Sequence, residues 1–377
     1  MTTTRTGEST VAPTLLIAFE LGHRKWKLGF SRGIGERPRV RTVDGGAVEA
    51  VAREIAKTKH MWKLEETTPV VSCYEAGRDG FWLHRWLVAQ GVTNYVVDSS
   101  SIEVNRRAKQ TKTDRLDLVG LLTSLARYVW GDRRVWRVVR VPTVAQEDMR
   151  HWHRSRATVQ GDRTRVINRI KALLATLGIR IPLDNAFLSR LEQARVWDGT
   201  PLPEAACARL RLDWTQLQEL NRHLRDVERV SATATFDRVT AAAASTLEQV
   251  RAIGPTIART LATELFGWRE IRNARQLGAL AGLIPGRYQS GETTRDLGIT
   301  RAGNVHVRRL SVELAWLWLR WQPTSALAQW YRQRFDGASP RVRRIGIVAL
   351  ARKLLVALWR YVDRGVRPEG AVLKSVR

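Results

Sequence analysis

The stretch Leu15-Leu16-Ile17-Ala18-Phe19-Glu20 decides the fold of the amino-terminal part of the chain. Its apolar residues form a short continuous run, which is typical of a buried β-strand, and a carboxylate follows directly. Residues 26–30 alternate in the manner of a second strand. Residues 39–43 are a third candidate because β-branched side chains favour extended backbone. The chain therefore begins with three strands in succession.

Strands then alternate with helices. Residues 48–55 carry apolar positions at helical spacing, and a strand is expected over residues 70–74. A helix over residues 81–87 leads to a last strand at residues 95–97. Three strands followed by alternating strands and helices predict an α/β domain with a mixed sheet, which excludes an all-parallel doubly wound sheet. We expect this domain to span residues 14–130.

Strand signals fade beyond the first domain. Apolar residues recur at helical spacing over residues 166–177 and 217–227, with a proline-containing connection between them. This pattern predicts a long, helical, coiled-coil-like middle domain over residues 131–245. Residues 246–377 are expected to form a mainly helical, all-α carboxy-terminal domain, interrupted by a glycine-rich loop at residues 282–303.

Charge indicates the partner. The 377 residues include 63 Lys and Arg against 36 Asp and Glu, a formal net charge of +27. Such an excess repels itself unless a polyanion neutralises it, and nucleic acid gains affinity by releasing condensed counterions. A membrane surface is the weaker alternative, because the basic residues are spread along the whole chain and not gathered on one amphipathic helix.

Other composition signals exclude several classes of protein. The two cysteines, Cys73 and Cys207, form no CxxC or Cys/His cluster, which argues against a disulfide framework and a structural zinc site. The polar amino terminus has no signal-peptide pattern, and no apolar run reaches the ~20 residues of a membrane helix. We expect a soluble, cytoplasmic protein.

The first long helix of the middle domain is rich in arginine. Its arginines outnumber their potential acidic partners within the helix, so a face that follows phosphates is favoured over an ordinary solvated face. The basic candidates here and in the last domain are Arg150, Arg154, Arg156, Arg163, Arg165, Arg169, Arg287, Arg295, Arg301, Arg308 and Arg309.

Four carboxylates in the first domain are candidate metal ligands. Glu20 and Glu75 end predicted strands, whereas Asp114 and Asp117 share one face of a predicted helix start. Together they provide the oxygen ligands that a two-metal phosphoryl-transfer site requires. Spacing alone does not single them out, because Asp98 also ends a strand and carboxylates favour helix starts for electrostatic reasons.

Two segments of the last domain have both ordinary and functional interpretations. Ser290 precedes Gly291 in the predicted loop, with arginines nearby; a serine that attacks a phosphodiester needs an exposed Oγ and cations. The commoner role of such a Ser-Gly pair is to begin a turn. Residues 250–258 resemble a helix–hairpin–helix turn, although an ordinary turn between helices is the commoner explanation of such a segment.

Taken together, the chain resembles the insertion-sequence 110 family of transposases, the DEDD transposases, with the Piv-type DNA invertases as relatives. The resemblance covers nearly the whole chain and rests on the order and spacing of several motifs. They are Tyr74-Glu75-Ala76-Gly77, Lys112-Thr113-Asp114-Arg115-Leu116-Asp117, Ile253-Gly254-Pro255, residues 275–283, Ser290-Gly291, residues 298–304 and residues 349–355.

The resemblance implies an RNase H-like, RuvC-type domain that holds Mg²⁺ and a carboxy-terminal transposase domain that carries a nucleophilic serine. Glu75, Asp114 and Asp117 match the second, third and fourth acidic positions of the family, and Ser290 matches its nucleophile. Glu20 stands at the first position, where the family usually has aspartate.

The resemblance also implies partners. A guide (bridge) RNA from the element would pair with donor and target DNA, and the protein would act as a homo-oligomer, a dimer or a tetramer. Two alternatives stay open at this point. One is a RuvC-like metal-dependent nuclease in which water attacks, and the other is a nucleic-acid-binding protein with a decayed site.

Overall fold

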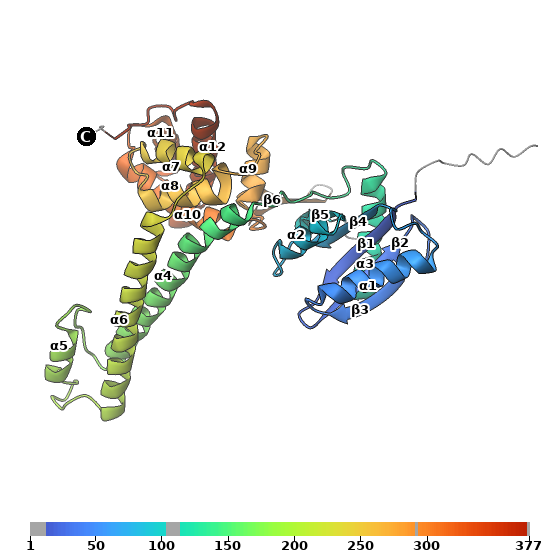
Figure 1. Ribbon diagram of the computed structural model, residues 1–377. Helices are drawn as coiled ribbons and strands as arrows, with labels where there is room; N and C mark the ends of the chain where they lie inside the picture. The colour runs from blue at the N-terminus through green and yellow to red at the C-terminus, as the bar shows by residue number, and fades with distance from the viewer. Residues whose placement is uncertain (1–12, 103–113, 291–292, 375–377) are drawn as a thin grey trace, which may run out of the picture. The chain divides into compact units, whose positions relative to one another are not determined.

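The structure, a computed structural model, describes residues 13–102, 114–290 and 293–374 of the chain (Figure 1). Contacts divide the chain into two compact units, residues 1–141 and residues 142–377. Each unit has hydrophobic clusters of its own. No helix among the described residues is long and apolar enough to cross a membrane.

The first unit is built on a five-stranded mixed sheet, as the sequence predicts. The strand order is β3-β2-β1-β4-β5. Strand β2 is antiparallel to both β1 and β3, whereas β4 runs parallel to β1 and β5 runs parallel to β4. This arrangement is consistent with an RNase H-like domain. The strands are β1 (Leu15–Leu21), β2 (Lys25–Ser31), β3 (Arg39–Asp44), β4 (Val70–Glu75) and β5 (Thr93–Val97).

Helices cover both faces of this sheet. Successive side chains of a strand point to opposite faces, so Ile17 and Ala18 belong to different clusters. Ile17 packs in a cluster with residues of α1 and α2, whereas Ala18 packs in a cluster with leucines of α3. The helices are α1 (Val48–Met61), α2 (Trp82–Ala89), the short η1 (Ser99–Ser101) and α3 (Asp114–Val129).

The second unit begins with a pair of long antiparallel helices, α4 (Val144–Thr176) and α6 (Glu204–Thr233) (Figure 1). Thr143 starts α4 with a capping box, in which its side chain accepts from the Gln146 backbone N–H and the Gln146 side chain accepts in return. The connection contains the short helix α5 (Phe187–Gln193), whose Phe187 ring packs on Trp214 of α6. The predicted helical middle therefore forms a hairpin that belongs to the same unit as the carboxy-terminal body.

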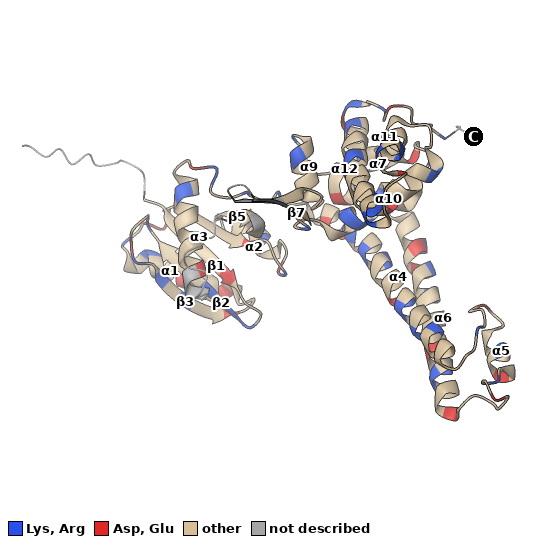
Figure 2. Ribbon diagram, turned by 180° about the vertical axis from the view of Figure 1, so that it is seen from behind, with Lys and Arg blue, Asp and Glu red and all other residues tan. Residues whose placement is uncertain are grey.

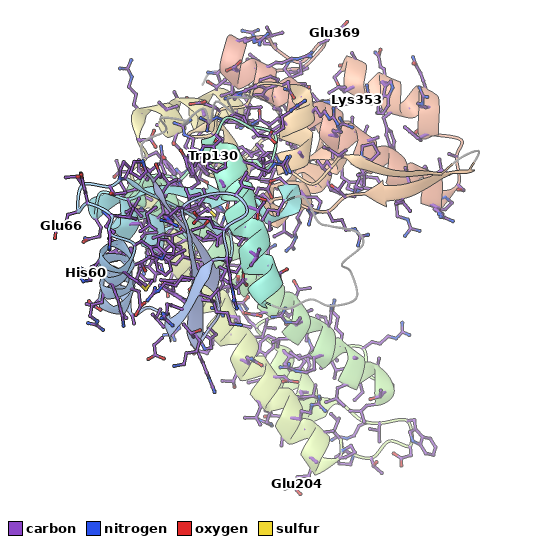
Figure 3. All side chains as sticks on the ribbon, turned by 90° about the vertical axis from the view of Figure 1, so that its right-hand side faces the viewer. His60, Glu66, Trp130, Glu204, Lys353 and Glu369 are labelled. Atoms are coloured by element: carbon purple, nitrogen blue, oxygen red, sulfur yellow. The ribbon has the colours of Figure 1, made fainter. Side chains whose placement is uncertain are left out.

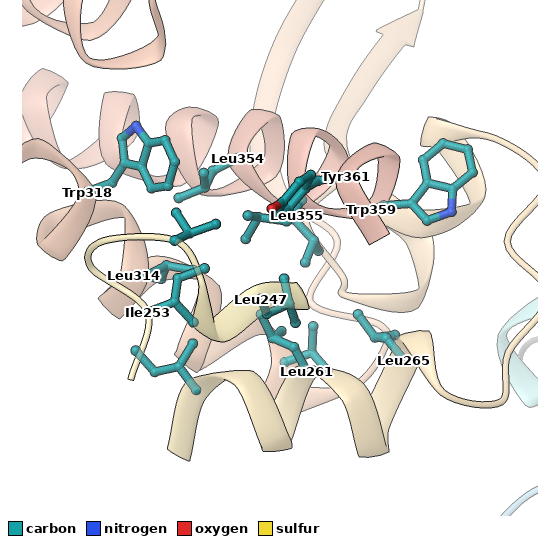
Figure 4. Close-up of a cluster of buried hydrophobic side chains, with 14 of the residues drawn as sticks. Leu247, Ile253, Leu261, Leu265, Leu314, Trp318, Leu354, Leu355, Trp359 and Tyr361 are labelled. Atoms are coloured by element: carbon teal, nitrogen blue, oxygen red, sulfur yellow. The ribbon is translucent and has the colours of Figure 1, made fainter. Parts of the chain in front are cut away.

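The carboxy-terminal body is a helical bundle with one large hydrophobic core and two smaller clusters. Leu247, Leu261, Leu314, Trp318 and Leu354 all lie in this core (Figure 4). Its elements are α7 (Arg238–Glu248), α8 (Pro255–Leu261), the π-helix η3 (Ala262–Phe266), α9 (Ala274–Leu280), α10 (Val305–Trp321), α11 (Ala326–Phe335) and α12 (Pro340–Arg364).

The segment predicted as a glycine-rich loop contains a β-hairpin. Strand β6 (Pro285–Ser290) pairs antiparallel with β7 (Thr293–Ile299), with an irregularity near Pro285. The prediction of a loop was wrong because the glycines end and bend the strands without preventing cross-strand backbone hydrogen bonds. Gly298, with φ of 77°, adopts a backbone conformation that glycine tolerates best.

Candidate active site

Two of the predicted carboxylates lie at the carboxyl ends of neighbouring parallel strands. The last paired residues of β1 and β4 are Phe19 and Tyr74, and the next residue on each strand is Glu20 and Glu75 respectively. Parallel strands in this register end at the same edge of the sheet, so the backbone brings these two glutamates side by side. Across the sheet, Glu20 is also paired in register with Lys27 of β2.

Both glutamates lie on the sheet face that α3 covers. Glu20 is two residues beyond Ala18, and Glu75 is two residues beyond Cys73; Ala18 and Cys73 both pack in the α3 cluster. Burial, followed by the negative charge of Glu75, raises the pKa of the Cys73 thiol. This influence agrees with Cys73 and Glu75 lying close together on one face.

Helix α3 begins at the same edge of the sheet. A Cβ atom added to Gly29, which pairs with Ala18, would meet Leu122 at 2.8 Å and Leu118 at 3.0 Å. Two residues beyond the end of β2, a Cβ at Gly33 would meet the ring of Trp130, which follows α3 (Figure 3). Helix α3 therefore runs from the carboxyl end of β1 toward its amino end.

The helix start brings two more predicted carboxylate residues to this edge. Asp114 is the first residue of α3, and Asp117, which is half-buried, lies one turn before Leu121 on the face that packs against the sheet. Residues 103–113, including Lys112 and Thr113 of the motif, lie outside the described residues. The edge thus collects Glu20, Glu75 and the start of α3.

The rival carboxylate Asp98 has a structural partner. It follows β5, and its Oδ2 atom lies 3.0 Å from Nη2 of Arg137, while its backbone N–H donates to the Arg137 carbonyl. The pair fastens the segment after α3 to the edge of the sheet. These contacts account for the position of Asp98 without a bound metal ion.

The donor chemistry at this edge fits Mg²⁺, which prefers carboxylate oxygens and retains several water ligands. Among the side chains that the structure describes, no three His, Cys, Asp or Glu residues are arranged to hold a metal ion. That set includes Glu20, Glu75 and Asp117 but not the side chain of Asp114. A complete metal centre at this edge is consequently a proposal.

Ser290 belongs to the second unit and ends strand β6. It pairs in register with Thr293, so it lies at the tip of the β6–β7 hairpin. At the base of the hairpin, the backbone N–H of Thr300 donates to the Ile284 carbonyl, and the Arg308 guanidinium donates to the carbonyl oxygens of Arg301 and Ala281. The nucleophile candidate is thus carried on a β-hairpin whose base is fastened by backbone hydrogen bonds.

The arginines predicted on α4 have partners inside the protein. Arg163 donates from Nε to Asn221 Oδ1 over 2.6 Å, and Arg169 forms an ion pair with Asp213 at 2.7 Å. Arg150 is buried, and its guanidinium lies 5.3 Å from the ring centroid of Trp268. These contacts join α4 to α6 and to the body.

The internal pairing of these arginines differs from the expectation that one face of α4 follows phosphates. The partners of Arg150, Arg163 and Arg169 come from other elements, so a balance of charges counted within α4 could not reveal them. Of the three remaining α4 candidates, Arg154 pairs with Glu264 at 2.7 Å, Arg156 pairs with Glu228 at 2.9 Å, and Arg165 pairs with Asp162 of the same helix. Lys and Arg residues also lie on α10 (Figure 2), of which Arg309 is exposed, and Arg301, which precedes this helix, is exposed as well. The side chains of Arg287 and Arg295 are outside the described set.

Sequence reasoning missed a buried carboxylate, Glu264 of η3. It is fully buried and accepts hydrogen bonds from His153 at 2.7 Å, from Arg154 at 2.7 and 2.9 Å, and from Asn304 at 2.6 Å. Asn304 also caps α10 by accepting from the backbone N–H groups of His306 and Val307. The only signal in the sequence was a single acidic residue within an apolar stretch. The structure adds that Glu264 lies on a π-helical turn, a feature frequent at functional sites.

The turn that resembles a helix–hairpin–helix motif joins α7 to α8. Ala252 has φ of 93°, and Gly254 caps α8 with Pro255 at its first position. Ile253 is buried in the core of the body. The turn therefore has a packing role, which agrees with the ordinary interpretation.

Comparison with known proteins defines the class: the chain is a DNA transposase. Residues 244–330 match the model of the Transposase IS116/IS110/IS902 family, and residues 41–179 match a second model, described as Transposase, of the DEDD type in IS110 elements. The protein belongs to the IS110 family of transposases, as the motifs of its sequence predicted.

Relatives along most of the chain support this assignment. "Putative transposase y4rJ" of Sinorhizobium fredii is 37% identical over 376 residues, which is 96% of this chain and 95% of the relative. "Putative transposase y4qE" of the same organism is 30% identical over 89% of this chain and 77% of its own length. The transposase for insertion sequence element IS1328 of Yersinia enterocolitica is 28% identical over 59% of this chain and 65% of the relative.

Proposed function

We propose that this transposase cuts and rejoins DNA through a covalent serine–DNA intermediate, with Mg²⁺ held by Glu20, Glu75, Asp114 and Asp117. The observation that carries the metal site is the register of β1 and β4. It places Glu20 and Glu75 directly after the last β1–β4 pair, at one edge of the sheet, where α3 begins with an aspartate. Carboxylates from separate elements at one edge supply the oxygen donors that phosphoryl transfer requires.

In the proposed reaction the Ser290 Oγ loses its proton and attacks the scissile phosphorus. The bond from phosphorus to one deoxyribose oxygen breaks as the bond to Oγ forms, and the leaving oxygen takes up a proton. One phosphate ester replaces another, so the energy of the bond is conserved for rejoining. Bound Mg²⁺ would stabilise the charge on the phosphate and on the leaving oxygen.

Ser290 and the carboxylates belong to different units of the chain, and the proposed reaction uses both. The several strand ends of an exchange reaction support a homo-oligomer, a dimer or a tetramer. Exposed Arg301 and Arg309 are candidates to stabilise charge on DNA, as are Arg287, Arg295 and Arg308.

We further propose that a guide RNA from the element pairs with donor and target DNA and selects the sequences, while the protein contacts backbone and shape. The net charge of +27 supports a large nucleic-acid partner. Sequencing the RNA that co-purifies with the protein, expressed with the DNA flanking its gene, tests this part. One discrete structured RNA from the flank is expected, and random cellular RNA alone would contradict guidance.

The covalent step is tested by trapping protein–DNA adducts on labelled DNA substrates in the presence of Mg²⁺. The Ser290→Ala variant should form no adduct. Its matched control, Ser189→Ala, alters an exposed serine of α5 and should form adducts at the normal level. If Ser290→Ala still forms adducts, Ser290 is not the nucleophile. If the unaltered protein yields free nicked ends and no adducts, a nuclease in which water attacks is favoured.

A further inference from the structure

A surface pocket lies in the second unit between α10, α11 and the start of α12. Its volume is about 560 Å³. Three guanidinium groups and one carboxylate lie among its lining residues, together with two aromatic rings. The lining residues that carry the argument are Trp316, Tyr331, Arg332, Asp336, Arg343 and Arg344.

Trp316 offers a free aromatic surface at this pocket. It is 51% exposed, and among the described residues no ring or cation lies over its indole. Trp321 on the same helix is different, because Arg320 and Arg251 lie over its ring at 5.1 and 5.5 Å. Likewise, the Lys353 Nζ atom lies over the ring of Trp330 of α11, 4.7 Å from the ring centroid. The exposed indole at the pocket is the one left without such a partner on α10.

The arginines of the pocket are not neutralised by carboxylates. Arg332 donates to the Pro323 carbonyl at 2.9 Å, and Arg344 donates to the Pro340 carbonyl at 3.2 Å. Within the described part of the chain, none of the three pocket arginines forms an ion pair, although Asp336 lines the same pocket. The arginines of α4 are the opposite case, since they pair with α6, with η3 or within their own helix.

We infer that this pocket binds an unpaired nucleotide of a single-stranded nucleic-acid segment. The base would stack on Trp316, and the flanking phosphates would contact Arg332, Arg343 and Arg344. Cationic grooves with exposed aromatic rings are the common solution for single strands, because every unpaired base has a free face for stacking. A duplex is not the expected ligand, since its bases already stack on one another. The inference rests on the transposase class and not on the covalent step proposed for Ser290.

The first test measures binding of the full chain to fluorescent oligothymidylate and oligouridylate by anisotropy over a series of salt concentrations. Trp316→Ala should weaken binding roughly tenfold, within the range for loss of one base-stacking contact. Its salt dependence should not change, because no phosphate contact is lost. Arg343→Gln should instead reduce the slope of log affinity against log salt by ~0.7, the value for one single-strand phosphate.

Two matched controls accompany these variants. Trp321→Ala removes a tryptophan from the same helix whose ring is already covered by arginines, and Arg229→Gln removes an exposed arginine that is paired with Asp226. Both should bind single strands as the unaltered protein does. Circular dichroism and thermal unfolding should show that all four variants fold, since every altered side chain is exposed.

A photochemical experiment tests direct contact. An oligonucleotide carrying 5-iodouracil should cross-link to Trp316, and the adduct is located by mass spectrometry. Equal single-strand affinity of Trp316→Ala and the unaltered protein would overturn the inference, as would an equal loss of affinity for a duplex. A larger loss for oligouridylate than for oligothymidylate identifies RNA as the strand, and the reverse identifies DNA. Ser290→Ala should retain single-strand binding, which separates this inference from the catalytic proposal.

Discussion

The guanidinium of Arg154 and the carboxylate of Glu264 form a two-point ion pair that joins α4 to η3. The Arg154 Nε and Nη2 atoms lie 2.7 and 2.9 Å from the two carboxylate oxygens. Because Asn304 donates to the same carboxylate and caps α10, one buried side chain connects the helical hairpin, the π-helix and the segment that follows the β6–β7 hairpin.

Loss of this carboxylate should destabilise the second unit. Glu264→Ala leaves His153, Arg154 and Asn304 without their acceptor, and breaking a buried ion pair typically costs ~3–5 kcal/mol. We expect the free energy of unfolding to fall by about 3 kcal/mol, a value at the low end because Arg154 is partly exposed. Denaturant titration followed by circular dichroism measures it. The control Glu228→Ala removes an exposed partner of Arg156 and should cost under ~1 kcal/mol; equal losses in the two variants would contradict the structural role.

The same carboxylate should make stability depend on pH in the acid range. Burial opposes ionisation of Glu264, but hydrogen bonds from His153 and Arg154 outweigh it and hold its pKa far below the ordinary range. A lowered folded-state pKa contributes stability that is present above the unfolded pKa of ~4.3 and is lost as the pH falls through lower values. The Tm difference between the unaltered protein and Glu264→Gln should therefore shrink below pH ~4. A constant difference from neutral to acid pH would show that the charge does not contribute.

Substitution of the carboxylates at the edge of the sheet should strongly reduce DNA cleavage without unfolding the protein. Glu75→Gln should reduce Mg²⁺-dependent DNA cleavage by roughly 10²-fold or more, a loss typical of removing one group that stabilises the transition state. Glu20→Gln should behave alike, whereas Glu20→Asp should retain activity because it keeps the carboxylate. The comparison is Asp98→Asn, which removes the partner of Arg137 and should cleave normally. If Asp98→Asn folds but does not cleave DNA, Asp98 would have to be included among the metal ligands.

Packing of α3 on the sheet should control the position of its first turn. Gly29→Val would push against Leu122 and Leu118, and overpacking of this kind costs ~1–3 kcal/mol. We expect lower stability and slower cleavage, because α3 carries Asp117. Gly120 on the exposed side of the same helix has open space around it, so Gly120→Ala should stabilise by roughly 0.5–1 kcal/mol. Both variants are compared by thermal unfolding and by their rate of DNA cleavage. Normal cleavage by a destabilised Gly29→Val would show that α3 does not contribute to the catalytic site.

Local patterns were sufficient for the strands and for the family. The apolar run at residues 15–19 and the strands that follow were predictable because a strand buried on both faces needs continuous apolar residues. The prediction of a transposase of the IS110 family is confirmed by the comparisons. The β6–β7 hairpin was not predicted, because its glycines are common to loops and to strand ends alike.

The sequence by itself determined the mixed sheet, the helical remainder, the family and the choice of carboxylates to examine, because each follows from residue type and spacing along the chain. Only the tertiary structure decided which charged groups have partners inside the protein. Arg154 and Glu264 are 110 positions apart, and Arg169 meets Asp213 across two helices. A charge can be neutralised by any group that folding brings near it, so the arginines of α4 have partners inside the protein, whereas Arg332, Arg343 and Arg344 form no ion pair within the described part of the chain.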